Sequence, residues 1–204
     1  MSSGANASGD ARVALKEWNI VCESLRRGEQ IALARKGGID DAPGAFELRS
    51  DTFALFPTNF HADIAGVDAP RAGEMKAGES VSCGVACRAT RAWRVKPEAA
   101  EACFERMAAA SGWPVDLFAK RANWKPTCGV TVVEVRAYAC EPPLVLAPDV
   151  ERFGGCKSWV DIDSWAYGKS ARAVLSDEAF AAKSAALARD MAALGAIEMD
   201  VSEA

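Results

Sequence analysis

The sequence predicts an α+β fold with a mostly antiparallel mixed sheet, flanking helices and a C-terminal helix. Helix and strand patterns follow one another in mixed order, so helices do not separate the strands regularly as they would in a parallel βαβ fold. The longest strand pattern, over residues 81–95, alternates apolar and polar positions, which is typical of an antiparallel strand with one buried face. Such a sheet either stays open or curls into a barrel.

The first predicted element is a helix over residues 11–27, and Gly28 is placed to end it. A strand is predicted over residues 30–35, where apolar residues alternate. The apolar residues of the predicted helix recur at steps of three and four, as on one helical face: Leu15, Trp18, Cys22 and Leu25.

Paired glycines predict a tight turn over residues 36–39. A second strand is predicted over residues 52–56. Pro57 should end that strand, because proline cannot donate a ladder hydrogen bond. An irregular, glycine-rich excursion over 63–78 follows.

Helices are predicted after Pro97, which suits a first helical turn, and from Ser176, which can cap one. Residues 130–138 are apolar on both faces, so we expect a central strand there, broken by Pro142 and Pro143. The shorter predicted elements are a helix over 114–122 and strands over 144–146 and 159–162.

The chain has 204 residues, 50% hydrophobic and 25% charged, which is the composition of a globular domain. We expect a disordered tail at 1–10, a single domain at 11–170 and a helix at 176–195 packed on it. The net charge of −4 excludes a generally basic nucleic-acid binder but permits a local basic patch. With no signal-peptide pattern and no apolar run of roughly 20 residues, we expect a cytoplasmic protein without membrane contact.

No motif in the chain names a reaction. His61 is the only histidine, and there is no nucleophile elbow, phosphate loop, dinucleotide fingerprint or paired-histidine metal motif. The seven cysteines are scattered through apolar patterns, which favours buried, reduced thiols over a zinc site. We therefore predict no metal and no cofactor, and the sequence leaves open whether the protein is an enzyme.

A small basic cluster is the strongest binding signal. Arg35 and Lys36 precede the Gly37-Gly38 turn, whose backbone N–H groups could hold a phosphate or carboxylate, and His61 could assist. The alternative interpretation is a solvated hairpin turn. Three tryptophans fall in loops or at element ends, where an indole ring could stack on a base: Trp113, Trp124 and Trp165.

Two other functions stay open. Asp116 and, 18 residues later, Glu134 with Arg136 approximate the pattern of magnesium-dependent PD-(D/E)xK nucleases, in which two carboxylates hold Mg²⁺ beside a lysine. Arginine stands in the lysine position, and a cross-strand ion pair is the plainer interpretation. The helix at 176–194 could instead dock a protein partner.

Several short motifs, in order, resemble a bacterial family of unknown function numbered 1802. The similarity extends over residues 11–162. Because some members of that family are joined to a restriction-endonuclease-like domain, the resemblance implies a role near DNA restriction or modification. The matching motifs are ALKEW at 14–18, Gly28-x-Gln30, ARKGGI at 34–39, Phe46, FALFPT at 53–58, His61 and GGCKSWVDI at 154–162.

A weaker resemblance concerns the fold. ASCH domains and related PUA-like barrels carry a Gly-x-Lys-x-x-Glu-x-Arg pattern that leads from a helix into the first strand. Gly28 and Arg35 match it, while Gln30 and Leu33 replace the lysine and the glutamate. The similarity implies a barrel with a cleft beside its first helix, lined by Arg35 and Glu17.

Our leading hypothesis is therefore an accessory module that binds nucleic acid, a nucleotide or another phosphate-bearing ligand. Its expected ligand-binding residues are Glu17, Trp18, Arg35, Lys36, Gly37, Gly38 and His61.

Overall fold

The computed structural model describes residues 10–37, 46–58, 79–111, 121–168 and 171–203. Its strands are β1 (Asp10–Trp18), β2 (Ala32–Arg35), β3 (Thr52–Thr58), β4 (Val81–Val95), β5 (Val130–Leu146), β6 (Trp159–Ala166), β7 (Ala171–Ala173) and β8 (Ile197–Met199). Its helices are α1 (Asn19–Arg26), η2 (Pro97–Ala99), α2 (Ala100–Ser111), α4 (Val150–Phe153), α5 (Asp177–Ala193) and η3 (Val201–Glu203).

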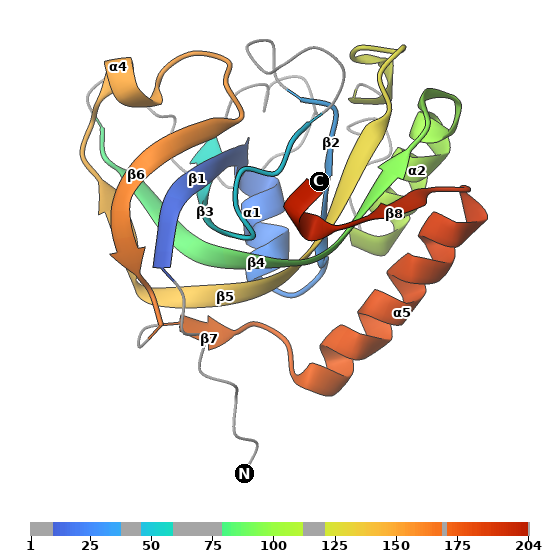
Figure 1. The fold of residues 1–204 in the computed structure, drawn as a ribbon. Coiled ribbons are helices and arrows are strands. Elements are labelled where there is room, and N and C mark those ends of the chain that lie inside the picture. Colours follow the sequence, from blue (N-terminus) through green and yellow to red (C-terminus); the bar gives the residue numbers. More distant parts are fainter. Residues whose placement is uncertain (1–9, 38–45, 59–78, 112–120, 169–170, 204) are drawn as a thin grey trace.

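The strands form one curled sheet in the order β2-β5-β4-β3-β1-β6, with β7 added to β5 and β8 added to β4 (Figure 1). Strands β1 and β3 run parallel, and every other strand pair in the described residues is antiparallel. The predicted α+β class and mostly antiparallel mixed sheet are therefore confirmed. The two ends of the sheet, β2 and β6, do not pair within the described residues, so the sheet curls without closing.

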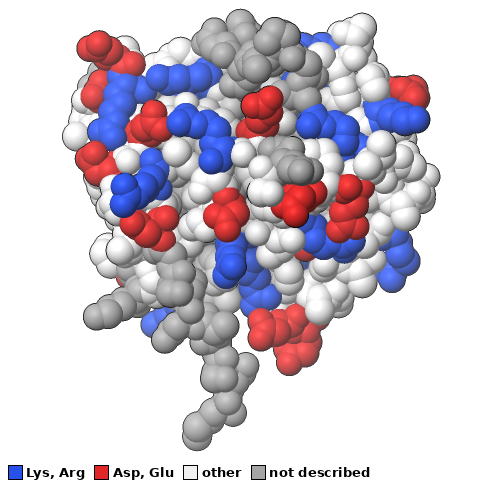
Figure 2. Space-filling view, in the orientation of Figure 1, with Lys and Arg blue, Asp and Glu red and all other residues white. Residues whose placement is uncertain are grey.

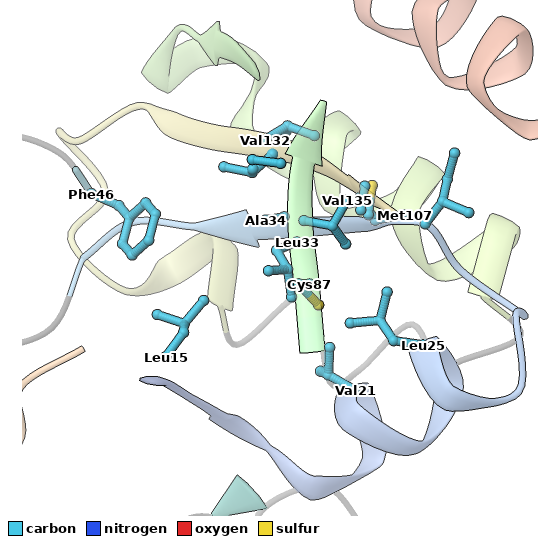
Figure 3. Close-up of a cluster of buried hydrophobic side chains, with 14 of the residues drawn as sticks. Leu15, Val21, Leu25, Leu33, Ala34, Phe46, Cys87, Met107, Val132 and Val135 are labelled. Atoms are coloured by element: carbon cyan, nitrogen blue, oxygen red, sulfur yellow. The ribbon is translucent and has the colours of Figure 1, made fainter. Parts of the chain in front are cut away.

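Hydrophobic side chains cover both faces of this sheet. On the concave side, α1 contacts β1, β3, β4 and β5 (Figure 1). Figure 3 shows Val21 and Leu25 of α1 in one cluster with strand residues that include Leu33 and Cys87. A second cluster contains alternating residues of the same strands, among them Phe56. Since both faces are apolar, the strands lose the simple alternation that marks a half-exposed sheet.

The helix predicted over residues 11–27 is wrong in its first half, where the chain forms β1. The step of three and four between Leu15, Trp18 and Cys22 arises from a strand followed directly by a helix. Along β1, Leu15 joins the concave cluster and Ala14 joins the opposite one, which is a period of two. Pairing with β3 on one side and β6 on the other supplies the backbone hydrogen bonds of this segment.

The prolines that were expected to end strands lie inside them. Pro57 is part of β3, whose pairing with β4 covers residues 52–54, and the later residues of β3 have no partner on that side among the described residues. Pro142 and Pro143 lie in β5 at a register shift, where the β4 pairing passes from Ala139 to Leu144. Proline is tolerated at both sites because no β4 ladder bond is needed there.

Several other predictions are confirmed. Ser176 caps α5 by accepting a hydrogen bond from the Ala179 N–H (3.2 Å). The strand over 81–95 and the helix after Pro97 also form. The single buried face predicted for that strand is wrong, because a register shift between Cys83 and Val85 places Val81 and Cys83 in the second cluster and Val85 and Cys87 in the concave one. Five cysteines are buried: Cys22, Cys83, Cys87, Cys103 and Cys140.

Other predictions are not tested by the described residues. The excursion at 63–78 and most of the helix at 114–122 lie outside them. Among the helices that are described, none combines the length and the apolar character needed to cross a membrane.

Candidate anion-binding site at the open seam of the sheet

The gap between β2 and the β1–β6 edge, which we call the seam, is bridged by Arg35. This last residue of β2 donates through Nη1 to the Lys16 carbonyl (3.1 Å) and to Oε2 of Glu17 (3.0 Å). Through Nη2 it donates to Oγ of Ser158, the residue before β6 (2.9 Å). Side-chain hydrogen bonds thus join the edges that backbone pairing leaves apart.

Glu17 is the anion at the centre of the seam, and its side chain is 0% exposed. Its carboxylate accepts hydrogen bonds from Arg35, from Nη2 of Arg121 (2.5 Å) and from the Trp18 N–H (2.8 Å). Burial alone would raise the pKa of Glu17, but the two guanidinium groups outweigh it and hold the pKa below its usual value. One carboxylate therefore faces two cations, which leaves one positive charge in excess.

Arg121 enters the seam from helical residues 121–123, which are distant in sequence. Its guanidinium lies 3.9 Å from the ring centroid of Trp18, and its Nη1 donates to the Ala34 carbonyl (3.3 Å). Burial lowers the pKa of Arg121, and Glu17 partly opposes that effect. The side chains of Arg35 and Arg121 keep 14% and 15% of their surface exposed, so both cations are largely buried but not sealed from solvent.

Lys36 directs its amine toward backbone carbonyl oxygens of the segment that follows Arg121. Its Nζ donates to the carbonyl oxygens of Ala122 (2.7 Å), Trp124 (3.1 Å) and Lys125 (3.4 Å). Burial lowers the pKa of this amine. Lys36 therefore fixes the segment that follows Arg121, and Trp124 on that segment is 47% exposed beside the seam.

The structure brings together four of the seven expected site residues. Gly37 follows directly at a positive φ of 81°. Gly38 and His61 lie outside the described residues. The four that converge are Glu17, Trp18, Arg35 and Lys36.

Sequence reasoning missed Arg121 and Ser158. Arg121 follows Arg35 by 86 residues and falls within a stretch predicted only as a short helix, so no local pattern links the two cations. Ser158 lies inside the GGCKSWVDI motif, and that motif was the one available signal. The sequence indicates Trp124 as a residue that could stack on a base, but it does not indicate that Lys36 and Arg121 lie near it.

The nuclease pattern is only partly described, because Asp116 lies outside the described residues. Glu134 on β5 is buried, and its Oε1 accepts a hydrogen bond from the Thr90 hydroxyl (2.7 Å). Arg136 pairs with Asp177 (2.7 Å) on α5 rather than with Glu134. The geometry of these residues therefore gives no support to a shared Mg²⁺ site.

Positive charge on the visible surface is local. Figure 2 shows the Lys and Arg side chains of the described residues interspersed with Asp and Glu. On this face a ligand would therefore meet individual cations rather than a broad basic area.

Comparison with known proteins gives a family and one structural likeness. The chain is similar to the crystal structure of ASCH from Zymomonas mobilis. The match covers 86% of this chain and 94% of the ASCH chain, at 11% sequence identity and a TM-score of 0.38. No curated protein matches the chain. The sequence profile of the family described as "Domain of unknown function (DUF1802)" matches residues 14–186. The motif resemblance is thereby confirmed, and the chain belongs to this family.

Proposed function

We propose that the protein binds single-stranded nucleic acid at the seam, with a backbone phosphate beside Arg35 and Arg121. The observation that carries this proposal is the pair of guanidinium groups on one buried carboxylate. Glu17 holds both cations in place and neutralises only one of them. A planar guanidinium can donate two parallel hydrogen bonds to two oxygens of one phosphate.

Trp124 supplies the second element of recognition. It is exposed, it belongs to the segment that carries Arg121, and Lys36 holds the carbonyl groups around it. A base can stack on an exposed indole ring in a way that tolerates any sequence. Lys36 thus acts as a positioning residue, because it fixes the ring before a ligand arrives.

Two cations on one carboxylate fit a short site that contacts one or two phosphates. With one or two phosphates bound, the logarithm of affinity should fall with the logarithm of salt at a slope of only about −0.7 to −1.4. The family resemblance suggests that such a module accompanies a DNA restriction or modification system.

Fluorescence anisotropy with labelled single-stranded DNA and RNA tests this function. We expect saturable binding at low salt, and Trp124→Ala should weaken it by about 1–3 kcal/mol, the usual contribution of one stacked base. Trp165→Ala is the matched control. Trp165 is a partly exposed tryptophan near the C-terminal end of β6, whereas the seam lies at the N-terminal end of that strand. Absence of binding at low salt, or equal affinities of the two variants, would contradict the proposal.

A further inference from the structure

A hollow lies on the sheet away from the seam, between β4, β5 and the first turn of α5. It has a volume of about 460 Å³ and shares no lining residue with the seam. This volume falls within the usual range for small-molecule sites, about 300–1,000 Å³. We call it the β4–β5 pocket, and its chemistry comes from Arg88, Thr90, Arg136, Tyr138, Asp177 and Phe180.

Two arginines occupy directly opposed positions in this pocket. Arg88 on β4 is the register partner of Arg136 on β5, so both side chains emerge on the same face of the sheet. Like charges in such positions repel each other and destabilise the sheet. An anion bound between them would remove that repulsion.

The two cations differ in what already binds them. Arg136 donates through Nη2 to the Leu175 carbonyl (2.9 Å) and to Asp177 (2.7 Å), and its guanidinium lies 4.8 Å from the centroid of the Phe180 ring. Arg88 is exposed, and its side chain has no hydrogen bond or ion pair within the described part of the chain. The lining residues therefore hold two cations against one carboxylate.

The remaining lining residues indicate the rest of the ligand. Tyr138 and Phe180 provide aromatic surface beside the cations. The hydroxyl of Thr90, a lining residue, donates its proton to Glu134 (2.7 Å), so its oxygen can only accept a hydrogen bond from a ligand. Asp177, 76% exposed at the rim, is a second acceptor. Two guanidinium donors, aromatic walls and two acceptors match a phosphate attached to a ring that carries N–H or O–H groups.

We propose that the β4–β5 pocket binds a free mononucleotide-sized organic phosphate, at a site separate from the seam. The phosphate lies between Arg88 and Arg136, and the ring lies against Tyr138 and Phe180.

Isothermal titration calorimetry of the full chain with adenosine monophosphate tests the proposal. We expect saturable binding at low salt that Arg88→Gln weakens at least tenfold, because Arg88 supplies the unpaired charge. Arg12→Gln is the matched control: Arg12 is 79% exposed on β1, and its loss should change the affinity less than twofold. Adenosine and inorganic phosphate should each bind at least tenfold more weakly than the nucleotide, because each lacks half of the contacts.

Three outcomes would overturn the proposal. These are no saturable binding of the nucleotide, equal binding by the Arg88→Gln variant and the wild type, or loss of nucleotide binding in Trp124→Ala. The last outcome would place the nucleotide in the seam. Because the pocket and the seam share no residue, oligonucleotide binding by the seam can fail or succeed without changing the expected result.

Discussion

Glu17 is the residue on which the charge balance of the seam depends. Its carboxylate is fully buried and accepts hydrogen bonds from two arginines and from its own neighbouring backbone N–H. Removing one partner from a buried ion pair is costly, because the partner that remains is left desolvated and uncompensated. Loss of the Glu17 carboxylate would leave both Arg35 and Arg121 without their ion-pair partner.

Glu17→Gln should therefore lower the free energy of unfolding at pH 7 by about 3–5 kcal/mol. The folded-state pKa of Glu17 lies below its usual value of 4.5, so its stabilising effect is present above the unfolded-state pKa and is lost as the pH falls through the folded-state pKa. The difference between wild type and variant should accordingly shrink as the pH falls below about 4.5. Urea unfolding over a series of pH values measures it.

Glu29→Gln serves as the control for this residue. Glu29 pairs with Arg27 at the surface (2.7 Å), with 43% of its side chain exposed, and exposed pairs contribute less than about 1 kcal/mol. Equal losses of unfolding free energy in the two variants would contradict the prediction that the buried ion pairs of Glu17 stabilise the fold more than an exposed pair does.

Helices α1 and α5 are each followed by a glycine with a positive φ, and the different surroundings of these glycines allow a test at the level of the element. After α1, Gly28 has a φ of 70°, and the bonds from Gly28 N to Leu25 O (3.1 Å) and from Glu29 N to Ser24 O (2.9 Å) form a Schellman motif. After α5, Gly195 has a φ of 63°. A Cβ on Gly28 would lie 2.7 Å from Cδ2 of Leu175, whereas one on Gly195 would meet no atom within 4 Å.

Gly195→Ala should cost about 1–2 kcal/mol of stability, the price of a left-handed backbone for alanine. Gly28→Ala should cost roughly 1 kcal/mol more, because the added methyl group crowds Leu175 and Val174. Chemical unfolding of both variants separates backbone strain from packing. A smaller loss in Gly28→Ala than in Gly195→Ala would contradict this explanation.

For the whole molecule, the question is whether α5 folds as part of the main hydrophobic core. Leu187 and Met191 belong to the same cluster as residues of β1, β2, β4 and β5, and Met191 is fully buried. Polar groups join the helix to the sheet as well, since Arg136 pairs with Asp177. A helix attached in this way should unfold together with the strands.

Met191→Ala should then lower the free energy of unfolding by about 2–5 kcal/mol, the usual range for such a truncation in a core. Circular dichroism and tryptophan fluorescence should report a single coincident transition. Met199→Ala, at a partly exposed position on β8, should cost under about 1 kcal/mol. An unchanged transition in Met191→Ala would instead favour a helix that is free to dock a partner.

Local chemistry in the sequence was enough to determine several features. The strand over 81–95, the Ser176 cap and the glycine after α1 each depend on residues close in sequence, and each is present in the structure. The adjacent positive charges of Arg35 and Lys36 also predicted a binding site in the part of the chain where the seam lies. These features share a cause, because hydrogen bonds and steric limits within a few residues fix them.

The tertiary structure alone decided the strand identity of β1, its parallel pairing with β3 and the composition of the seam. The sequence of β1 satisfies a helical step as well as a strand period, and only partners on both sides select the strand. Arg121 reaches Glu17 across 104 residues of chain, and Ser158 reaches Arg35 across 123. Such contacts depend on how distant strands pack together, which no short pattern records.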